Sequence, residues 1–160
     1  MKYFFLHIPK TGGKTLNKIF QDILGNAEVK SFDTAGLNLN RHTLATLQPL
    51  LISGHWFAVS HFVGVQLRKF FNYRYCFTFL RHPVDRFLSQ YYFYRNNVES
   101  TSKHTVEQAK RLDLIQYVTY YRNHRSLDIQ NVQVMQLAGA IDPTMPDRQL
   151  LESAKENLAM

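Results

Sequence analysis

The fold is decided by residues 3–16, which read YFFLHIPKTGGKTL. The first four are a short, aromatic-rich apolar run of the kind that forms a buried strand, and the proline and glycines at residues 9–13 predict a turn. The apolar residues that follow recur at helical spacing until Gly25 supplies a stop signal; they are Leu16, Ile19, Phe20, Ile23 and Leu24. Strand, glycine loop and helix are the first half of a βαβ unit, so we expect a parallel sheet with helices on its faces.

The rest of the chain is expected to add strands first and helices afterwards. Further strands are predicted at residues 50–53 and 74–80; because three strands make a small sheet, we expect either another near residues 28–32 or an early end of the chain. A helix is predicted to begin at Pro83, with Arg86 and Ser89 on the face opposite its apolar stripe of Val84, Phe87, Leu88 and Tyr91. Residues 96–105 are expected to form a loop, followed by helices at 112–123, 127–138 and 147–159.

Length and composition limit the class of protein. The chain has 160 residues, 45% of them hydrophobic and 19% charged, which fits one folded domain and excludes intrinsic disorder. No apolar run approaches the roughly 18–20 residues of a membrane span, and residues 1–7 do not resemble a secretory signal. The single cysteine, Cys76, excludes an intrachain disulfide and a cysteine zinc site. We therefore expect one soluble, cytoplasmic domain over residues 1–160.

The charge of the chain is strongly basic. Lysine and arginine number 19 against 12 acidic residues, which gives a net charge of +7 and a pI near 9.6. Such an excess favours a polyanionic partner, which could be a nucleic acid, a phosphorylated or sulfated ligand, or an acidic glycan. Composition does not choose among these partners.

Residues 8–15 combine the features of an anion-binding loop. The backbone N–H groups of such a loop and the N-terminus of its helix converge on a bound anion, and Gly12 and Gly13 would let the backbone approach that anion closely. Two lysines could add positive charge and two threonines could add a hydroxyl donor: Lys10 or Lys14, and Thr11 or Thr15. The alternative is a glycine turn whose lysines are merely solvated.

The sequence distinguishes this loop from a nucleoside-triphosphate loop. Residues 13–15 match the end of the pattern G-x-x-x-x-G-K-[ST], but Ile8 stands where its first glycine is required. A triphosphate site also needs a carboxylate at another strand end to hold Mg²⁺, whereas the strand expected at residues 74–80 ends in Arg81 and His82. We therefore expect a phosphate site without a metal.

Three motifs occur in order along the chain: HIPKTGGKTL at residues 7–16, FLRHPVDRFLSQYY at residues 79–92 and NVQVMQLAG at residues 131–139. They resemble the 5′-phosphosulfate loop, the 3′-phosphate motif R-D-P-x-x-R-x-x-S-x-Y and the later N-x-Q-x-x-x-L-x-G helix of the carbohydrate sulfotransferases of the heparan-sulfate 2-O/6-O type. Lys14 departs from the usual Thr or Ser, and His82 from the usual Asp. The family's later segment is missing after residue 160, so we expect a bacterial-type short form or a C-terminally truncated domain.

The resemblance implies a P-loop NTPase-like three-layer α/β fold, with a parallel central sheet flanked by helices and a helix-rich C-terminal half. It implies sulfuryl transfer from 3′-phosphoadenosine 5′-phosphosulfate (PAPS) to a hydroxyl of a carbohydrate or glycolipid, with 3′-phosphoadenosine 5′-phosphate (PAP) as product and with neither a metal nor a nucleic-acid partner. Lys10 would stabilise the leaving phosphate, and Arg81 and Ser89 would hold the 3′-phosphate. The residues that would bind the 5′-phosphosulfate are Lys10, Thr11, Gly12, Gly13, Lys14 and Thr15.

An attacking hydroxyl needs a general base, and the chain has seven histidines. His55 is preferred, because it follows Gly54 and a predicted strand in a context similar to that of the family's catalytic histidine; His61 is the reserve. The alternative is an ordinary loop or core histidine, and the neighbouring Trp56 suits an acceptor sugar or a core equally well. Two other classes stay open, a P-loop nucleotide kinase or NTPase and a non-catalytic anion-binding fragment.

Overall fold

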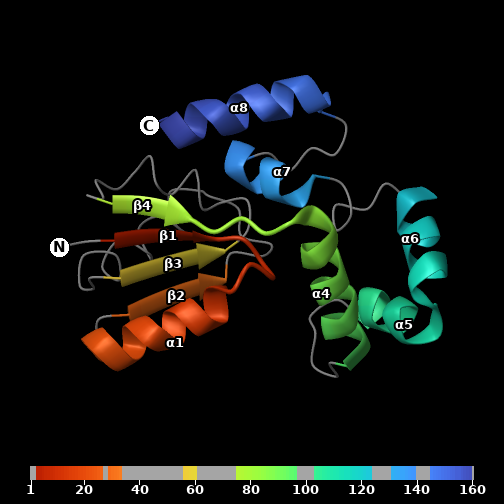
Figure 1. The fold of residues 1–160 in the computed structure, drawn as a ribbon, viewed down its shortest axis with the longest axis horizontal. Helices are drawn as coiled ribbons and strands as arrows, with labels where there is room; N and C mark the ends of the chain where they lie inside the picture. The colour runs from red at the N-terminus through yellow and green to blue at the C-terminus, as the bar shows by residue number, and fades with distance from the viewer. Residues whose placement is uncertain are drawn as a thin grey trace, which may run out of the picture. The chain divides into compact units, whose positions relative to one another are not determined.

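The computed structural model describes residues 3–26, 29–33, 56–60, 75–96, 103–123, 131–139 and 145–159. They form a mixed α/β structure, mostly helical, that divides into two compact units (Figure 1). The first unit comprises residues 1–80 and 133–160 and the second residues 81–132. Within the described ranges, no helix has both the length and the apolar character needed to cross a membrane.

The first unit is built on a parallel sheet. Its strands are β1 (Tyr3–His7), β2 (Val29–Asp33), β3 (Trp56–Ser60) and β4 (Tyr75–Thr78), in the order β2-β3-β1-β4 (Figure 1). Tyr3 is level with the first residue of β3 and the first residue of β4, and His7 is level with Ser60 at the end of β3. The chain therefore leaves the inner strand β1 at the edge where its parallel neighbours also end.

Most strands of this sheet agree with the prediction from the sequence. β1 and β4 confirm the strands expected at residues 3–6 and 74–80, and β2 is the further strand considered near residues 28–32. β3 was not predicted, and the strand expected at residues 50–53 lies outside the described residues. The parallel sheet with a helix-rich C-terminal half is confirmed, while the three-layer arrangement and the single domain stay predictions.

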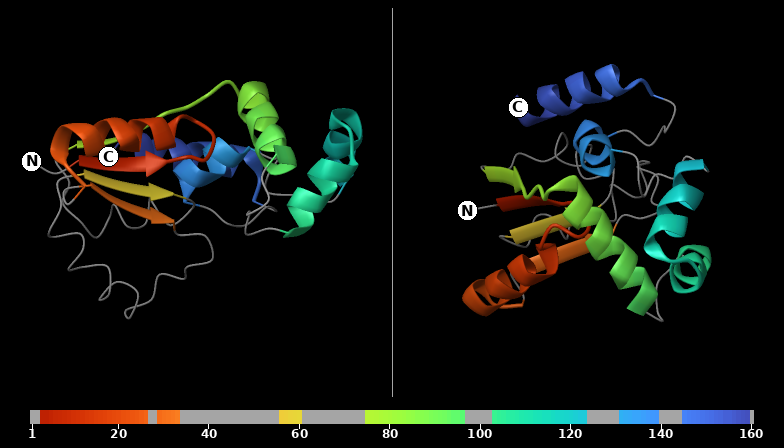
Figure 2. Two further views of the ribbon diagram at one scale, coloured as in Figure 1. Left: turned by 90° about the horizontal axis from the view of Figure 1, so that it is seen from below. Right: turned by 45° about the vertical axis from the view of Figure 1, so that its right-hand side comes forward.

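Helix α1 (Gly13–Leu24) lies along one face of the sheet (Figure 2). Its Leu16 and Phe20 pack on Phe5 of β1 and Val29 of β2. The predicted apolar stripe of α1 is only partly correct, because Ile23 is 69% exposed and Ile19 and Leu24 are also exposed. The helix is thus attached through Leu16 and Phe20, whereas its last three residues, 22–24, are exposed.

Aromatic side chains of β1 and β4 line the same face of the sheet. Because side chains alternate along a strand, Tyr3, Phe5 and His7 point to one side of β1. Tyr3 stacks on Tyr75 of β4 at 5.3 Å between ring centroids, and Phe5 lies 5.4 Å from Phe77 in the same register. This aromatic row ends at His7, the last residue of β1, whose ring stacks on Phe5 at 5.7 Å.

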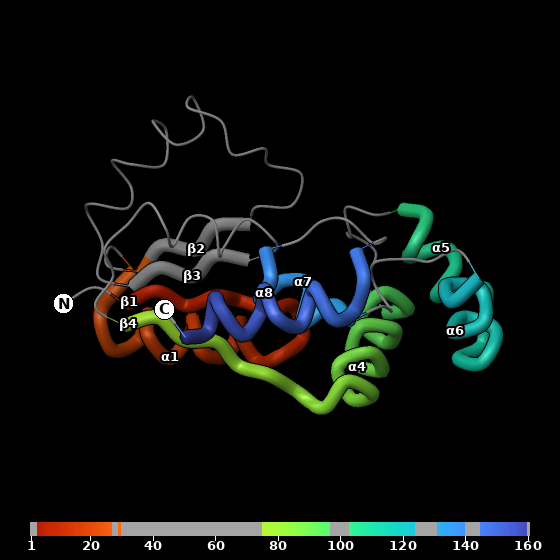
Figure 3. Tube along the Cα trace, turned by 90° about the horizontal axis from the view of Figure 1, so that it is seen from above, coloured from red at the N-terminus to blue at the C-terminus, as the bar shows by residue number. Residues whose placement is uncertain are grey.

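Helices α7 (Val132–Ala138) and α8 (Asp147–Ala159) lie side by side (Figure 1 and Figure 3). The buried Asn157 joins them, because its Nδ2 donates a hydrogen bond of 2.9 Å to the carbonyl oxygen of Leu137 near the end of α7. α8 has the predicted bounds. The first residues predicted for α7, 127–130, lie outside the described residues.

The second unit contains α4 (Pro83–Asn96), α5 (Lys103–Arg111) and α6 (Leu114–Asn123). Its core is aromatic: Tyr91, Tyr117 and Tyr121 are buried around Ala109, and the rings of Tyr117 and Tyr121 are 4.5 Å apart. α4 begins at Pro83 as predicted. The prediction of a loop over residues 96–105 is wrong from residue 103 onward, because α5 begins there; its sequence KHTVEQAKR offers too few apolar residues to show a helical period.

The faces of α4 also differ from the prediction. Val84, expected in the apolar stripe, is 57% exposed, whereas Arg86, expected on the opposite face, is only 4% exposed. Gln90, one turn after Arg86, is buried as well. Polar side chains that bond to one another therefore occupy the inner face of this helix, which a count of apolar positions does not detect.

Candidate functional site

The loop between β1 and α1 opens with a tight turn over residues 8–11. Pro9 stands second in this turn and Lys10 third, with a φ of 71° for Lys10. Proline in the second position and a positive φ in the third are typical of a type II turn, which favours glycine or asparagine at the third position. Holding a lysine in the left-handed region costs about 1–2 kcal/mol. Such strain is typical of functional sites.

Thr11 closes the same turn. It is buried, and its Oγ1 donates a hydrogen bond of 2.7 Å to the carbonyl oxygen of Ile8, itself fully buried. The hydroxyl hydrogen of Thr11 is therefore engaged within the loop. Of the two threonines predicted to supply a hydroxyl donor, the structure favours the exposed Thr15 in the first turn of α1.

Helix α1 begins without the side-chain cap that many helices have. Gly12 is its N-cap residue, no side chain caps it, and its first turn contains no acidic residue. Helix α6 differs, because Asp113 accepts a hydrogen bond of 2.8 Å from the backbone N–H of Gln116, and Gln116 accepts one of 3.2 Å in return. That reciprocal pair is a capping box. The N-cap residue of α1, at the carboxyl edge of the sheet, thus makes no side-chain hydrogen bond to the start of its helix.

Lys14 adds positive charge to this end of α1, in the first turn and exposed. A helix N-terminus carries a partial positive charge, so a lysine there is unfavourable by some 0.3–1 kcal/mol unless an anion balances it. Lys10, half-buried, lies in the turn just before the helix. The loop therefore concentrates positive charge where the helix dipole is already positive.

The two glycines of the loop have different roles. Gly12 has a φ of 95°, and a Cβ built on it would meet nothing within 4 Å, so its glycine is required by backbone conformation. A Cβ built on Gly13 would lie 2.1 Å from Cδ2 and 2.2 Å from Nε2 of His7, so there the glycine is required by a close approach. Sequence reasoning counted His7 among the seven histidines but did not predict its contact with Gly13; the available signal was a histidine that ends an aromatic strand directly before the loop.

The residues predicted for the 3′-phosphate belong to the second unit. Arg81 is exposed and stands two residues before α4, while Ser89 is half-buried within α4. The residues of the glycine loop, 8–15, belong to the first unit. Lys10, Lys14 and Thr15 thus lie around one helix N-terminus in the first unit. Arg81 and Ser89 lie at and in α4 of the second unit.

The sequence model of the sulfotransferase family matches residues 1–139. The chain belongs to the sulfotransferase family. No curated protein and no solved structure matches the chain. The matched residues of this sulfotransferase include the glycine loop, α4 and α7, whereas α8 follows them.

The histidines predicted as general base in this sulfotransferase lie outside the described residues. The chain neighbour of His55 is Trp56, which begins β3 level with Tyr3, and the chain neighbour of His61 is Ser60, which ends β3 level with His7. Among the residues that the structure describes, no cluster of three histidine, cysteine or acidic side chains could hold a metal ion.

Proposed function

We propose that this sulfotransferase moves a sulfuryl group from PAPS to a hydroxyl of a carbohydrate or glycolipid and releases PAP. One observation carries the proposal: at the carboxyl end of the inner strand β1, helix α1 has a glycine as N-cap with no side-chain cap, no acid in its first turn, and Lys14 in that turn. Ligands of parallel α/β sheets bind at this edge, and helix N-termini favour anions. We also propose that the whole chain forms one P-loop-like, three-layer domain.

The loop would bind the 5′-phosphosulfate of the donor. Backbone N–H groups of Gly12 and Gly13, with the Thr15 hydroxyl and the Lys14 ammonium, would surround its oxygens. Thr11 would contribute its backbone N–H, since its hydroxyl hydrogen already bonds to Ile8. The donor supplies the sulfuryl group, whose bond to the bridging oxygen breaks as the acceptor oxygen attacks sulfur. Lys10 would stabilise the negative charge that this leaves on the phosphate.

Arg81 and Ser89 would bind the 3′-phosphate. An arginine can donate two parallel hydrogen bonds to a phosphate, and a serine hydroxyl can donate another. Arg81 is exposed and just precedes α4, which contains Ser89. Their assignment rests on the resemblance of residues 79–92 to the 3′-phosphate motif of the family.

His55 is the proposed general base, with His61 as the alternative. A base must reach the acceptor hydroxyl while that hydroxyl faces the sulfuryl group. The resemblance favours His55, which follows Gly54. The described strand favours His61, because Ser60 ends β3 beside His7 at the carboxyl edge, while Trp56 begins β3 about 13 Å away at the other edge. Histidine suits this role because its ordinary pKa is about 6.5.

The acceptor is proposed to be a neutral or acidic glycan or a glycolipid. The net charge of +7 fits an acidic glycan and fits the donor with its two phosphate groups. The heparan-sulfate type of acceptor is a proposal from the resemblance of the motifs at residues 7–16, 79–92 and 131–139. The resemblance of these motifs also supports a reaction without a metal and without a nucleic-acid partner. The cytoplasmic location stays a prediction.

Thermal unfolding with PAP, and in parallel with ATP and Mg²⁺, tests the donor. A ligand at 100 times its Kd adds about 2.7 kcal/mol to the free energy of unfolding, which raises Tm by several degrees. A rise with PAP alone supports the proposal. A rise with ATP and Mg²⁺ alone would contradict it in favour of a kinase, and no rise with either would favour a fragment unable to bind its donor.

Release of PAP from PAPS in the presence of glycan acceptors then tests the chemistry. His55→Ala is expected to abolish acceptor-dependent release while PAP binding stays intact, and His61→Ala is expected to retain it. The reverse result would move the base to His61. Full activity in both variants would contradict a histidine base at either position.

A further inference from the structure

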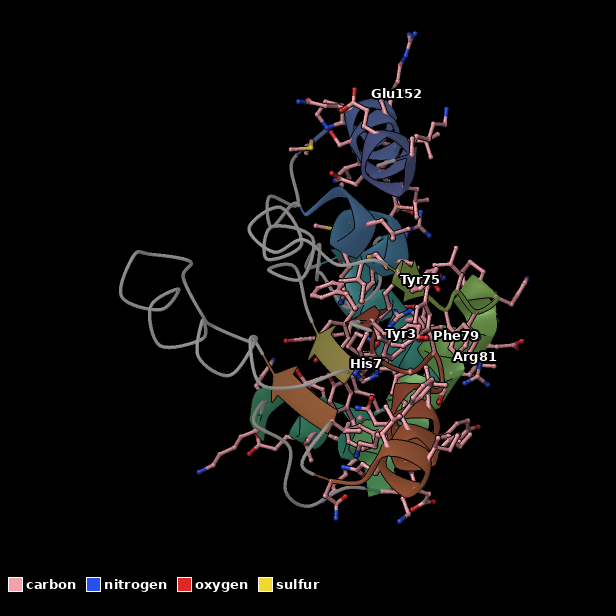
Figure 4. All side chains as sticks on the ribbon, turned by 90° about the vertical axis from the view of Figure 1, so that its left-hand side faces the viewer. Tyr3, His7, Tyr75, Phe79, Arg81 and Glu152 are labelled. Carbon is pink, nitrogen blue, oxygen red and sulfur yellow. The ribbon has the colours of Figure 1, made fainter. Side chains whose placement is uncertain are left out.

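His7 is the strongest feature of the site that the proposed chemistry does not use. It is the last residue of β1 and is half-buried (Figure 4). Its ring stacks on Phe5 with an interplanar angle of 22°. Its Cδ2 and Nε2 occupy the space into which a Cβ on Gly13 would project, at 2.1 and 2.2 Å. The imidazole therefore lies directly against the first residue of α1.

The contact explains a glycine that helix propensity disfavours. Gly13 is the first helical residue, and glycine in a helix costs about 1 kcal/mol relative to alanine. Unlike Gly12 and Gly25, it does not have a positive φ, so the backbone conformation alone does not require it. The ring of His7 does require it, because no side chain at residue 13 could share that space.

The same contact fixes a distance that matters for anion binding. The first N–H groups of α1 and the Lys10 side chain can contact the same phosphate only if the distance between the end of β1 and the start of α1 is fixed. Leu16 and Phe20 attach the following turns of α1 to the sheet. At the loop itself, the His7 ring lies against Gly13 and so links the end of the strand to the start of the helix.

We propose that His7 is a positioning residue for the 5′-phosphosulfate: its ring holds the N-terminus of α1 at the height above β1 that donor binding requires. The inference rests on the proposed function. It acts through Gly13 and the backbone of α1, and it attributes no proton transfer to the imidazole. The ring belongs to the aromatic row of Tyr3 and Phe5, which supports a role through shape.

Calorimetric titration of the full chain with two probes, PAP and adenosine 3′-phosphate, tests the proposal. The Kd of adenosine 3′-phosphate divided by the Kd of PAP reports the contribution of the 5′-phosphate, because the two probes differ only in that group. His7→Ala should reduce this ratio about tenfold or more, equal to about 1.4 kcal/mol, and His7→Phe should restore it to within about threefold. Tyr3→Ala is the matched control: it removes a ring from the same face of β1, far from the loop, and should lower Tm with an unchanged ratio.

Each outcome separates this inference from the proposed function. Failure of the wild-type chain to prefer PAP over adenosine 3′-phosphate would contradict the proposed function itself. With that preference present, an unchanged ratio in His7→Ala would overturn the role of His7, and so would a ratio that His7→Phe fails to restore. Should His7→Ala not fold, Gly13→Ala serves instead, because its methyl group must displace the ring; an unchanged ratio there overturns the role equally.

Discussion

Nη1 of Arg86 donates a hydrogen bond of 2.6 Å to Oε1 of Gln90, one turn further along α4 and buried with it. Nε2 of Gln90 in turn donates to the hydroxyl of Tyr94 at 3.1 Å, one more turn along. The inner face of α4 is therefore a chain of polar groups in a site with little water. Hydrogen bonds to charged groups in such surroundings contribute more to stability than neutral ones.

Arg86→Met is expected to lower the free energy of unfolding by about 2–3 kcal/mol, because Gln90 loses a charged donor inside the protein. Arg122→Met, on the exposed surface of α6 in the same unit, is the matched control and should change it by less than about 0.5 kcal/mol. Urea unfolding of both variants measures the difference. The double variant Arg86→Met with Gln90→Leu should recover part of the loss, because it removes both partners. Equal losses in Arg86→Met and Arg122→Met would contradict the buried chain.

The parts of the fold that the sequence predicted are those whose pattern is local. The run YFFL, the glycine pair and the helical spacing after Gly13 each depend on a few adjacent residues, and β1, the loop and α1 follow from them. Strand β3 depends instead on its neighbours: WFAVS at residues 56–60 is a strand because it pairs with both β1 and β2. Pairing with neighbouring strands is not visible in a local pattern, so β3 was not predicted.

The candidate site shows the same division. The position of Lys10, Lys14 and the glycine pair between a strand and a helix could be predicted, since the order strand, glycine loop, helix is recognisable in the sequence. The separate roles of Gly12 and Gly13 could not, because one depends on a backbone angle and the other on a ring from β1. Burial of Arg86 was hidden for a related reason: polar groups satisfied by one another look like a solvated face in the sequence.

Lys14 and Lys18 offer a test of the charge at the N-terminus of α1. Lys14→Met should raise the stability of the ligand-free chain by about 0.3–1 kcal/mol, because it removes a cation from the positive end of the helix. The same change should weaken PAP binding and reduce its dependence on salt concentration. Calorimetric titration at two ionic strengths and thermal unfolding measure both effects.

Lys18→Met is the control for that experiment. Lys18 lies one turn later and pairs with Asp22 at 2.8 Å, with side chains 70% and 61% exposed. Such a pair contributes at most about 0.5 kcal/mol, so this variant should lower stability slightly and leave PAP affinity unchanged. Equal loss of PAP affinity in both variants would point to general surface charge in place of a site at Lys14.

Two substitutions of Lys10 distinguish the effect of its backbone strain from the effect of its charge. Lys10→Gly and Lys10→Ala both remove the ammonium group, but only glycine relieves a φ of 71°. We expect Lys10→Gly to be more stable than Lys10→Ala by about 0.5–1 kcal/mol, while both lose sulfuryl transfer. Thermal unfolding and PAP release from PAPS measure the two properties. Equal stabilities would show that residue 10 does not adopt the left-handed conformation.

Because His7 contacts Gly13, the effect of Gly13→Ala on stability is expected to change sign when the His7 ring is removed. In the wild-type background, Gly13→Ala should lower stability by about 1–3 kcal/mol, because its Cβ would lie 2.1 Å from the ring and the core must shift. In the His7→Ala background the ring is gone, and the same substitution should raise stability by up to about 1 kcal/mol, since alanine is the better helix former.

Gly12→Ala supplies the control for this cycle. A Cβ there meets nothing within 4 Å, and the cost comes from a φ of 95°, so the variant should lose about 1–2 kcal/mol in both backgrounds. Urea unfolding of wild type, the three single variants and the two double variants gives both coupling energies. Coupling near zero for Gly12 and above about 1 kcal/mol for Gly13 is expected, because only the second pair shares the same space. Coupling near zero for Gly13 as well would mean that His7 does not hold the start of α1, and the positioning role would lose its structural basis.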